Sequence, residues 1–216
     1  PNLRNMALGA LANIGNPESY KLLLKAAQDA NFNYEPTHAA EAFLIYSDRL
    51  AERGETKLSQ KALKTLMKAN QADDKLHNYS AALSVYAKHF GYEAMPLLLK
   101  AVDSNNKEFR YAALNIAENI GGVAGTRQWI EKAGTLSGEK KAEIFDMLGR
   151  RGDKLAVGFI TGNLNDASAN VREDAIEALT RLQGKEAVPV LLNHLEKGTD
   201  IEAVKTALVQ LIDQKH

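Results

Sequence analysis

The chain has 216 residues and equal numbers of basic and acidic side chains, 27 of each, so no net charge attracts nucleic acid or an anionic membrane from a distance. It lacks cysteine, which excludes disulfides, thiolate nucleophiles and cysteine metal sites. Hydrophobic residues make up 45% of it, yet no apolar run approaches the roughly 18 residues of a membrane helix, so we expect a folded, soluble protein without membrane insertion. Composition does not decide whether it is cytoplasmic, periplasmic or secreted.

The first helical hairpin is expected over residues 1–30. The apolar residues of its first helix recur at three- and four-residue spacing, which predicts that they face the core: Leu3, Met6, Ala7, Ala10, Leu11 and Ile14. Gly15 and Asn16 end this helix, and Pro17 begins the next. Because this pattern follows directly on Pro1, which is not an initiating methionine, we expect a processed or truncated piece of a longer protein.

Two further pairs are expected over residues 35–70 and 74–103. In the first, a helix that begins at Pro36 ends at Gly54. Its partner places four residues toward the core, Leu58, Ala62, Leu66 and Ala69, and four on the opposite side, Lys57, Lys61, Lys64 and Lys68. In the second pair, Pro96 marks the beginning of a helix, because the first-turn amides have no carbonyl partner within the helix.

The rest of the chain is expected to form three pairs and a closing helix, over residues 106–134, 138–164, 166–197 and 200–213. The pair at 138–164 is poor in large aliphatic residues and contains Gly149, Gly152, Gly158 and Gly162. Each glycine costs about 1 kcal/mol relative to alanine inside a helix. We therefore expect local opening between Gly138 and Gly162. The closing helix is expected to have a polar outer face, supplied by Glu202, Lys205 and Asp213.

The clearest landmarks lie in the pair at 166–197. There Asp166 is followed six residues later by Arg172, and Pro189 opens the second helix within the sequence Ala-Val-Pro-Val. A second set of such residues occurs earlier in the chain, at similar spacing: Asp103, Arg110 and Pro96. These landmarks resemble those of HEAT-type repeats, a family that includes the HEAT-like repeats of bilin lyases.

This resemblance implies an all-α fold, namely a right-handed α-solenoid of about six stacked helical hairpins and a closing helix, formed as a single repeat array over residues 1–216. A pair of short amphipathic helices cannot bury its apolar faces alone, so each pair needs neighbours. The resemblance also implies structural roles for Asp166 and Arg172, because the corresponding residues of the family bridge neighbouring loops.

No residue pattern in the sequence identifies catalysis or a cofactor. A serine elbow, a phosphate-binding glycine loop and a paired-carboxylate motif are all missing. His38 and Glu41 stand three residues apart, as do Asp74 and His77, and each pair could give zinc two ligands. The sequence identifies no third ligand. We therefore predict no metal, no cofactor and no enzymatic activity.

The lysine stripe, defined as Lys57, Lys61, Lys64 and Lys68, is the candidate binding site. Its common explanation is a solvated helix face, since lysine is a good helix former. The alternative is that this second helix of its pair lines the concave surface, as in HEAT-type solenoids, and that the stripe meets an acidic segment or phosphates. Tyr20 and Tyr92, on other second helices, are candidate contacts on the same surface, whereas Trp129 is expected in the core.

Most of these features serve helix stacking, which favours a non-catalytic scaffold that presents a concave surface to a protein or peptide. One alternative function is that of an accessory repeat region in a larger secreted bacterial enzyme, because HEAT-like arrays accompany sugar-hydrolase-like domains. The other is a HEAT-type nucleic-acid-binding protein. The balanced charge disfavours nucleic acid, since such modules carry a basic excess.

Overall fold

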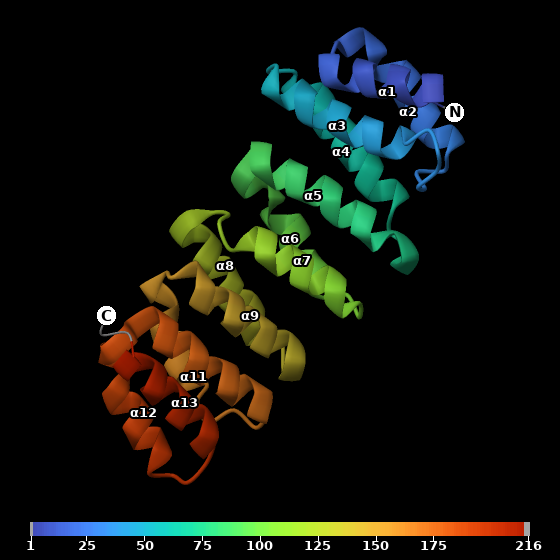
Figure 1. Ribbon diagram of the computed structural model, residues 1–216. Coiled ribbons are helices and arrows are strands. Elements are labelled where there is room, and N and C mark those ends of the chain that lie inside the picture. Colours follow the sequence, from blue (N-terminus) through green and yellow to red (C-terminus); the bar gives the residue numbers. More distant parts are fainter. Residues whose placement is uncertain (1, 214–216) are drawn as a thin grey trace. The chain divides into compact units, whose positions relative to one another are not determined.

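The computed structural model describes residues 2–213, which form α-helices and short 3₁₀ helices without any strand (Figure 1). Pro1 and residues 214–216 lie outside this described range. The all-α prediction is confirmed. The helices group into two compact units, residues 1–94 and 95–216, and the division falls inside the predicted pair at 74–103. None of the helices in the described range has the length and apolar content that a membrane crossing needs.

Helical hairpins stack one after another in the first unit. Its α-helices are α1 (Asn2–Ile14), α2 (Tyr20–Asp29), α3 (Ala39–Glu52), α4 (Thr56–Ala69) and α5 (Leu76–Phe90). Short 3₁₀ helices flank them at η1 (Pro17–Ser19), η2 (Asp73–Lys75) and η3 (Gly91–Ala94). Helix α3 packs against α1, α2 and α4, and α5 packs against α4. Aromatic rings fill much of this core, because Phe43, Tyr46 and Tyr86 are buried between the helices.

Two details of α3 and α4 differ from the sequence-based prediction. Helix α3 begins at Ala39 rather than at Pro36, because His38 adopts a left-handed conformation with φ of 53° that interrupts the helical path. The core face of α4 is centred on Leu63 and Met67 together with Ala62 and Leu66. The face is therefore rotated slightly from the predicted one, because α4 packs between α3 and α5.

The prediction for the buried face of α1 is wrong. Leu3, Met6 and Ile14 are 82%, 71% and 57% exposed, and the residues that α1 buries are Leu8 and Ala12. Apolar residues surround much of this helix, so the spacing alone allowed more than one inward face. Helices α2 and α3 pack against α1 in this unit, and they cover only the side that carries Leu8 and Ala12.

The second unit contains further hairpins of the same kind. Its α-helices are α6 (Met95–Ala101), α7 (Lys107–Ala117), α8 (Gly122–Gly134), α9 (Gly138–Arg151), α10 (Val157–Gly162), α11 (Ala169–Gln183), α12 (Val188–Leu195) and α13 (Ile201–Asp213), with 3₁₀ helices η4 (Lys154–Ala156) and η5 (Gly184–Ala187). Pro96 and Pro189 are the second residues of α6 and α12, where the sequence places helix beginnings. Trp129 is fully buried, as predicted.

Helix α9 is better packed than its sequence suggests. Ile144, Phe145 and Met147 are all fully buried, and α9 packs along α11. A Cβ atom on Gly149 would lie only 2.9 Å from the Cα atom of Ala178, so this glycine permits a close approach of the two helices. This packing disfavours the local opening expected between Gly138 and Gly162 where it concerns α9. Local opening stays a prediction for the short helix α10, whose two glycines have open space beside them.

The outer face of the last helix carries two of the predicted polar residues, Glu202 and Lys205, together with exposed apolar residues; the Asp213 side chain lies outside the described part of the chain. Helix α13 buries Val204 and Leu211, while Val209 and Ile212 are 56% and 66% exposed. Glu202 supplies polar surface as expected, and its carboxylate accepts a 2.7 Å hydrogen bond from the Lys205 ammonium group. The outer face is thus mixed, since polar and apolar residues alternate along it.

Candidate functional site

The lysine stripe lies on the exposed face of α4. The five residues that α4 buries are Ser59, Ala62, Leu63, Leu66 and Met67, and this leaves the side with the lysines open to solvent. All four lysines are exposed. Because they occur at offsets of four, three and four residues, they form one row along about 16 Å of the helix. The structure therefore brings the whole predicted stripe together on one surface.

A shallow hollow follows this row. It has a volume of ≈ 510 Å³, and α4 alone supplies its lining: Lys57, Gln60, Lys61, Lys64, Thr65 and Lys68. Within the described residues, none of the four lysines forms an ion pair, whereas Lys25 and Lys88 of the same unit bind carboxylates. The charge of the stripe is therefore not neutralised by contacts inside the fold.

Two buried tyrosines lie beneath the stripe. The Lys61 ammonium group is 5.3 Å from the centre of the Tyr20 ring, and that of Lys64 is 5.6 Å from the centre of the Tyr86 ring. These distances fit cation–π contacts, which hold the lysine stems over the rings. Tyr20 is only 8% exposed, and its burial raises the pKa of the phenol. It supports the stripe from below rather than offering a surface contact.

Acidic residues lie at one end of the stripe and beside its middle. Glu55 precedes α4, and Glu93 accepts a 2.8 Å hydrogen bond from the Gln60 side chain. The Tyr86 hydroxyl lies 3.4 Å from the same Glu93 carboxylate. Tyr92, the other predicted aromatic contact, belongs to η3 and is 48% exposed. The positive surface is therefore short, with carboxylates beside it.

The predicted landmark residues form ion pairs that join successive elements of the second unit. The Arg172 guanidinium binds both carboxylate oxygens of Asp200, at 2.8 and 3.0 Å, and donates to the Asp166 carbonyl at 2.9 Å. Arg110 binds Glu143 in the same bidentate manner, at 2.7 and 2.6 Å, and donates to the Ser104 carbonyl at 3.2 Å. Two arginines at equivalent positions thus tie a preceding loop to a following element.

The carboxylates of the landmark aspartates bind lysines instead of the arginines. Asp166 accepts hydrogen bonds from Lys141, at 2.8 Å, and from the Ser168 backbone amide, at 2.9 Å. The Lys141 contact is the largest cause that holds the pKa of Asp166 below its usual value. Asp103 is bound by Lys132 at 2.6 Å. These contacts favour structural over catalytic use of both aspartates.

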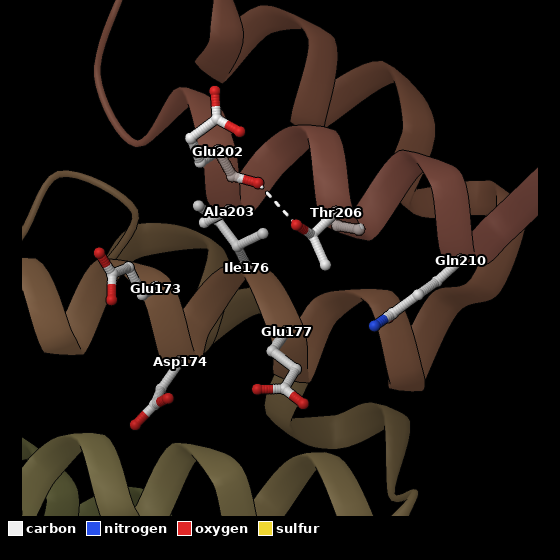
Figure 2. A pocket seen from close by; sticks show the side chains of 9 residues that line it. Glu173, Asp174, Ile176, Glu177, Glu202, Ala203, Thr206 and Gln210 are labelled. Carbon is white, nitrogen blue, oxygen red and sulfur yellow. Dashed lines mark hydrogen bonds between the residues drawn. The ribbon is translucent and has the colours of Figure 1, made fainter.

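A second hollow, of ≈ 440 Å³, lies between α11 and α13 and is acidic (Figure 2). Its carboxylates come from Glu173, Asp174, Glu177 and Glu202. Burial, followed by repulsion from Asp146, raises the pKa of Asp174 to about 6. Figure 2 shows the Glu202 and Asp174 carboxylates on opposite sides of the hollow, so they do not converge on one ion. The sequence analysis missed this hollow, because Glu202 comes from a different helix.

The two histidine–carboxylate pairs that were considered for zinc, and for which the sequence offers no third ligand, lie in the first unit. His38 and Glu41 bind each other, with 2.8 Å between Nδ1 and Oε2. His77 lines the same small pocket of ≈ 250 Å³, but Asp74 belongs to η2 and does not line it. Over residues 2–213, no group of three or more such side chains has the geometry to hold a metal.

Stacked helical hairpins with inter-loop arginines define the class of this chain as an α-helical repeat protein. Residues 126–212 match the family model of HEAT repeats, and residues 3–29 match that of the PBS lyase HEAT-like repeat. The chain is thus built from HEAT-like repeats, a type that commonly serves as a protein-interaction scaffold. Neither matched segment reaches α4. A search of curated proteins gave no match.

Proposed function

We propose that the chain is a non-catalytic protein-interaction module whose lysine stripe binds an acidic peptide segment of a partner protein. The observation that carries this proposal is the row of four exposed lysines without an ion pair in the described residues. Each exposed lysine–carboxylate contact contributes only about 0.2 to 1 kcal/mol, so several must act together. Four lysines in a row on one face of α4 can make several such contacts with the same peptide.

The dimensions of the stripe favour a short peptide over nucleic acid. About 16 Å of helix corresponds to roughly five residues of extended chain, at about 3.3 Å for each. A polynucleotide would continue past Lys57, where Glu55 would repel its phosphates. The chain as a whole carries no basic excess to compensate for that repulsion.

A binding measurement with a matched control tests the proposal. The probe is a fluorescent penta-glutamate peptide, and the test variant replaces Lys57, Lys61, Lys64 and Lys68 by glutamine. The control variant replaces four exposed lysines on other elements by glutamine, namely Lys21, Lys100, Lys185 and Lys205. It therefore changes the net charge by the same amount as the test variant. We expect the stripe variant to bind about tenfold or more weakly and the control variant to retain wild-type affinity.

Two results would contradict this proposal. If both variants lose the same affinity, the peptide responds to overall charge and the stripe is an ordinary solvated face. If a single-stranded DNA of ten nucleotides binds more tightly than the peptide, and the stripe variant loses that binding, the partner class is nucleic acid. Circular dichroism of each variant checks the fold, because changes at exposed lysines typically alter stability by less than about 0.5 kcal/mol each.

A further inference from the structure

One side of α1 is apolar and uncovered. Leu3, Met6 and Ile14 are 82%, 71% and 57% exposed, and Ala7 and Ala10 between them are exposed as well. These exposed residues of α1 recur at the three- and four-residue spacing of a helix–helix interface along the whole helix. In contrast, the opposite side of the helix is buried at Leu8 and Ala12. The uncovered side therefore has the pattern of a packing surface.

The repeat register identifies what kind of surface this is. Residues 2–18 align with residues 170–186 without a gap, and this alignment pairs Arg4 with Arg172 and Glu18 with Glu186. It also pairs the uncovered residues Leu3, Ala7, Ala10 and Ile14 of α1 with Val171, Ala175, Ala178 and Leu182 of α11. All four residues of α11 are buried, at 0%, 0%, 0% and 5% exposure. The same positions are thus interior in one repeat and exposed in the other.

In α11 this side receives the first helix of the preceding hairpin. Helix α9 packs along α11, and Gly149 of α9 lies directly against Ala178, the residue that aligns with Ala10. Helix α9 follows the same rule at two of these positions. When Ala156 is aligned with Ser19, Ile144 and Met147 of α9 align with Ala7 and Ala10 of α1. Both Ile144 and Met147 are fully buried.

We propose that the uncovered side of α1 is a repeat–repeat interface, and that its occupant is a further HEAT-type hairpin that precedes Leu3 in the natural polypeptide. This hairpin packs in the register that α9 and α10 use on α11, with a small residue over Ala10. Ala7 and Ala10, at the centre of the uncovered side of α1, permit the close backbone approach that Gly149 and Ala178 show. A second copy of the chain fits this side less well, because one helix face offers less than the roughly 800 Å² per partner of a standard stable interface.

The test supplies a hairpin of known register to the full chain. Residues 138–168, which contain α9 and α10, are fused in front of Pro1, so that Ser168 precedes the first helix as it precedes α11. We expect the backbone amides of α1 to exchange with solvent at least about tenfold more slowly in the fusion than in the wild-type chain. The control fusion carries Gly149→Leu in the added hairpin, which blocks the close approach and should abolish the slowing.

Three outcomes would overturn the proposal. The first is unchanged exchange of α1 in the fusion, and the second is equal slowing with the Gly149→Leu hairpin. The third is a concentration-dependent dimer of the wild-type chain, measured by sedimentation, that Ala10→Glu converts to a monomer. That result would assign the uncovered side to a second copy. Because these measurements do not involve the lysine stripe, they are independent of the peptide-binding proposal.

Discussion

The carboxyl group of Asp174 is the clearest single-residue source of pH dependence. Its pKa of about 6 in the folded chain lies above the ordinary value of 3.8, chiefly because of burial. Between these values the folded chain holds a proton that the unfolded chain has lost. The resulting stabilisation is complete below pH 3.8 and is lost as the pH rises through 6. At neutral pH the ionised Asp174 therefore destabilises the fold.

Asp174→Asn should remove this penalty. We expect the free energy of unfolding to rise by roughly 1 to 2 kcal/mol at about pH 7.5, and the gain to vanish near pH 3.5 where the aspartate is protonated in both states. Urea denaturation at the two pH values measures the effect. The exposed Glu196 provides a control, because Glu196→Gln makes the same charge change and Glu196 is not among the groups that raise the pKa of Asp174. Equal gains for both variants would contradict the role of burial.

Two glycines of the second unit should respond oppositely to replacement by alanine. In Gly149→Ala the new methyl group would lie 2.9 Å from the Ala178 Cα atom, so α9 and α11 must separate, at a cost of about 1 to 3 kcal/mol. Gly158 in α10 has no atom within 4 Å of the same position, and Gly158→Ala should stabilise by about 0.5 to 1 kcal/mol. Thermal unfolding of both variants checks the signs, and a tolerated Gly149→Ala would disprove the close approach.

At the scale of one element, α12 is attached to the second unit by a single face. Leu191 is fully buried, whereas its neighbour Leu192 is 46% exposed. We expect Leu191→Ala to lower the free energy of unfolding by about 2 to 5 kcal/mol, and Leu192→Ala to lower it by less than about 1 kcal/mol. Chemical denaturation measures both on the same helix. A loss under about 0.5 kcal/mol for Leu191→Ala would mean that the wrong face of α12 has been assigned to the core.

Helix positions could be predicted from this sequence better than helix faces. Proline and glycine mark helix ends by fixed backbone preferences, which is why Pro96 and Pro189 were placed correctly. The buried side of α1 depends on which neighbours pack against it, and Leu3 and Leu8 fit an apolar pattern equally well. Local spacing therefore determines where a helix runs, while tertiary packing determines which side it buries.

The same distinction applies to the candidate site. The lysine stripe was predictable because one helix contains all four residues at helical spacing. The position of Tyr20 beneath Lys61 was not, because it requires α2 and α4 to lie close together. The acidic hollow was missed for a similar reason, since α11 and α13 each supply only part of it. Features made by two elements need the fold before they can be identified.

For the whole molecule, the balance of 27 basic and 27 acidic residues makes salt dependence a test of local charge. A neutral chain has no long-range field of one sign, and at physiological salt the field of the stripe fades over about 8 Å. Any salt dependence of acidic-peptide binding should therefore come from lysines in direct contact with the peptide.

We expect the affinity of the wild-type chain for penta-glutamate to fall by about tenfold or more between about 50 and 300 mM salt. The glutamine variant of the stripe should lose this dependence together with the affinity. The variant at Lys21, Lys100, Lys185 and Lys205 has the same net charge but should keep the wild-type salt dependence, because its lysines lie outside the stripe. Fluorescence anisotropy over a series of salt concentrations measures the salt dependence of peptide binding by the stripe variant and by the control variant. If the salt dependence follows net charge and is the same in both variants, contact with the stripe does not determine binding.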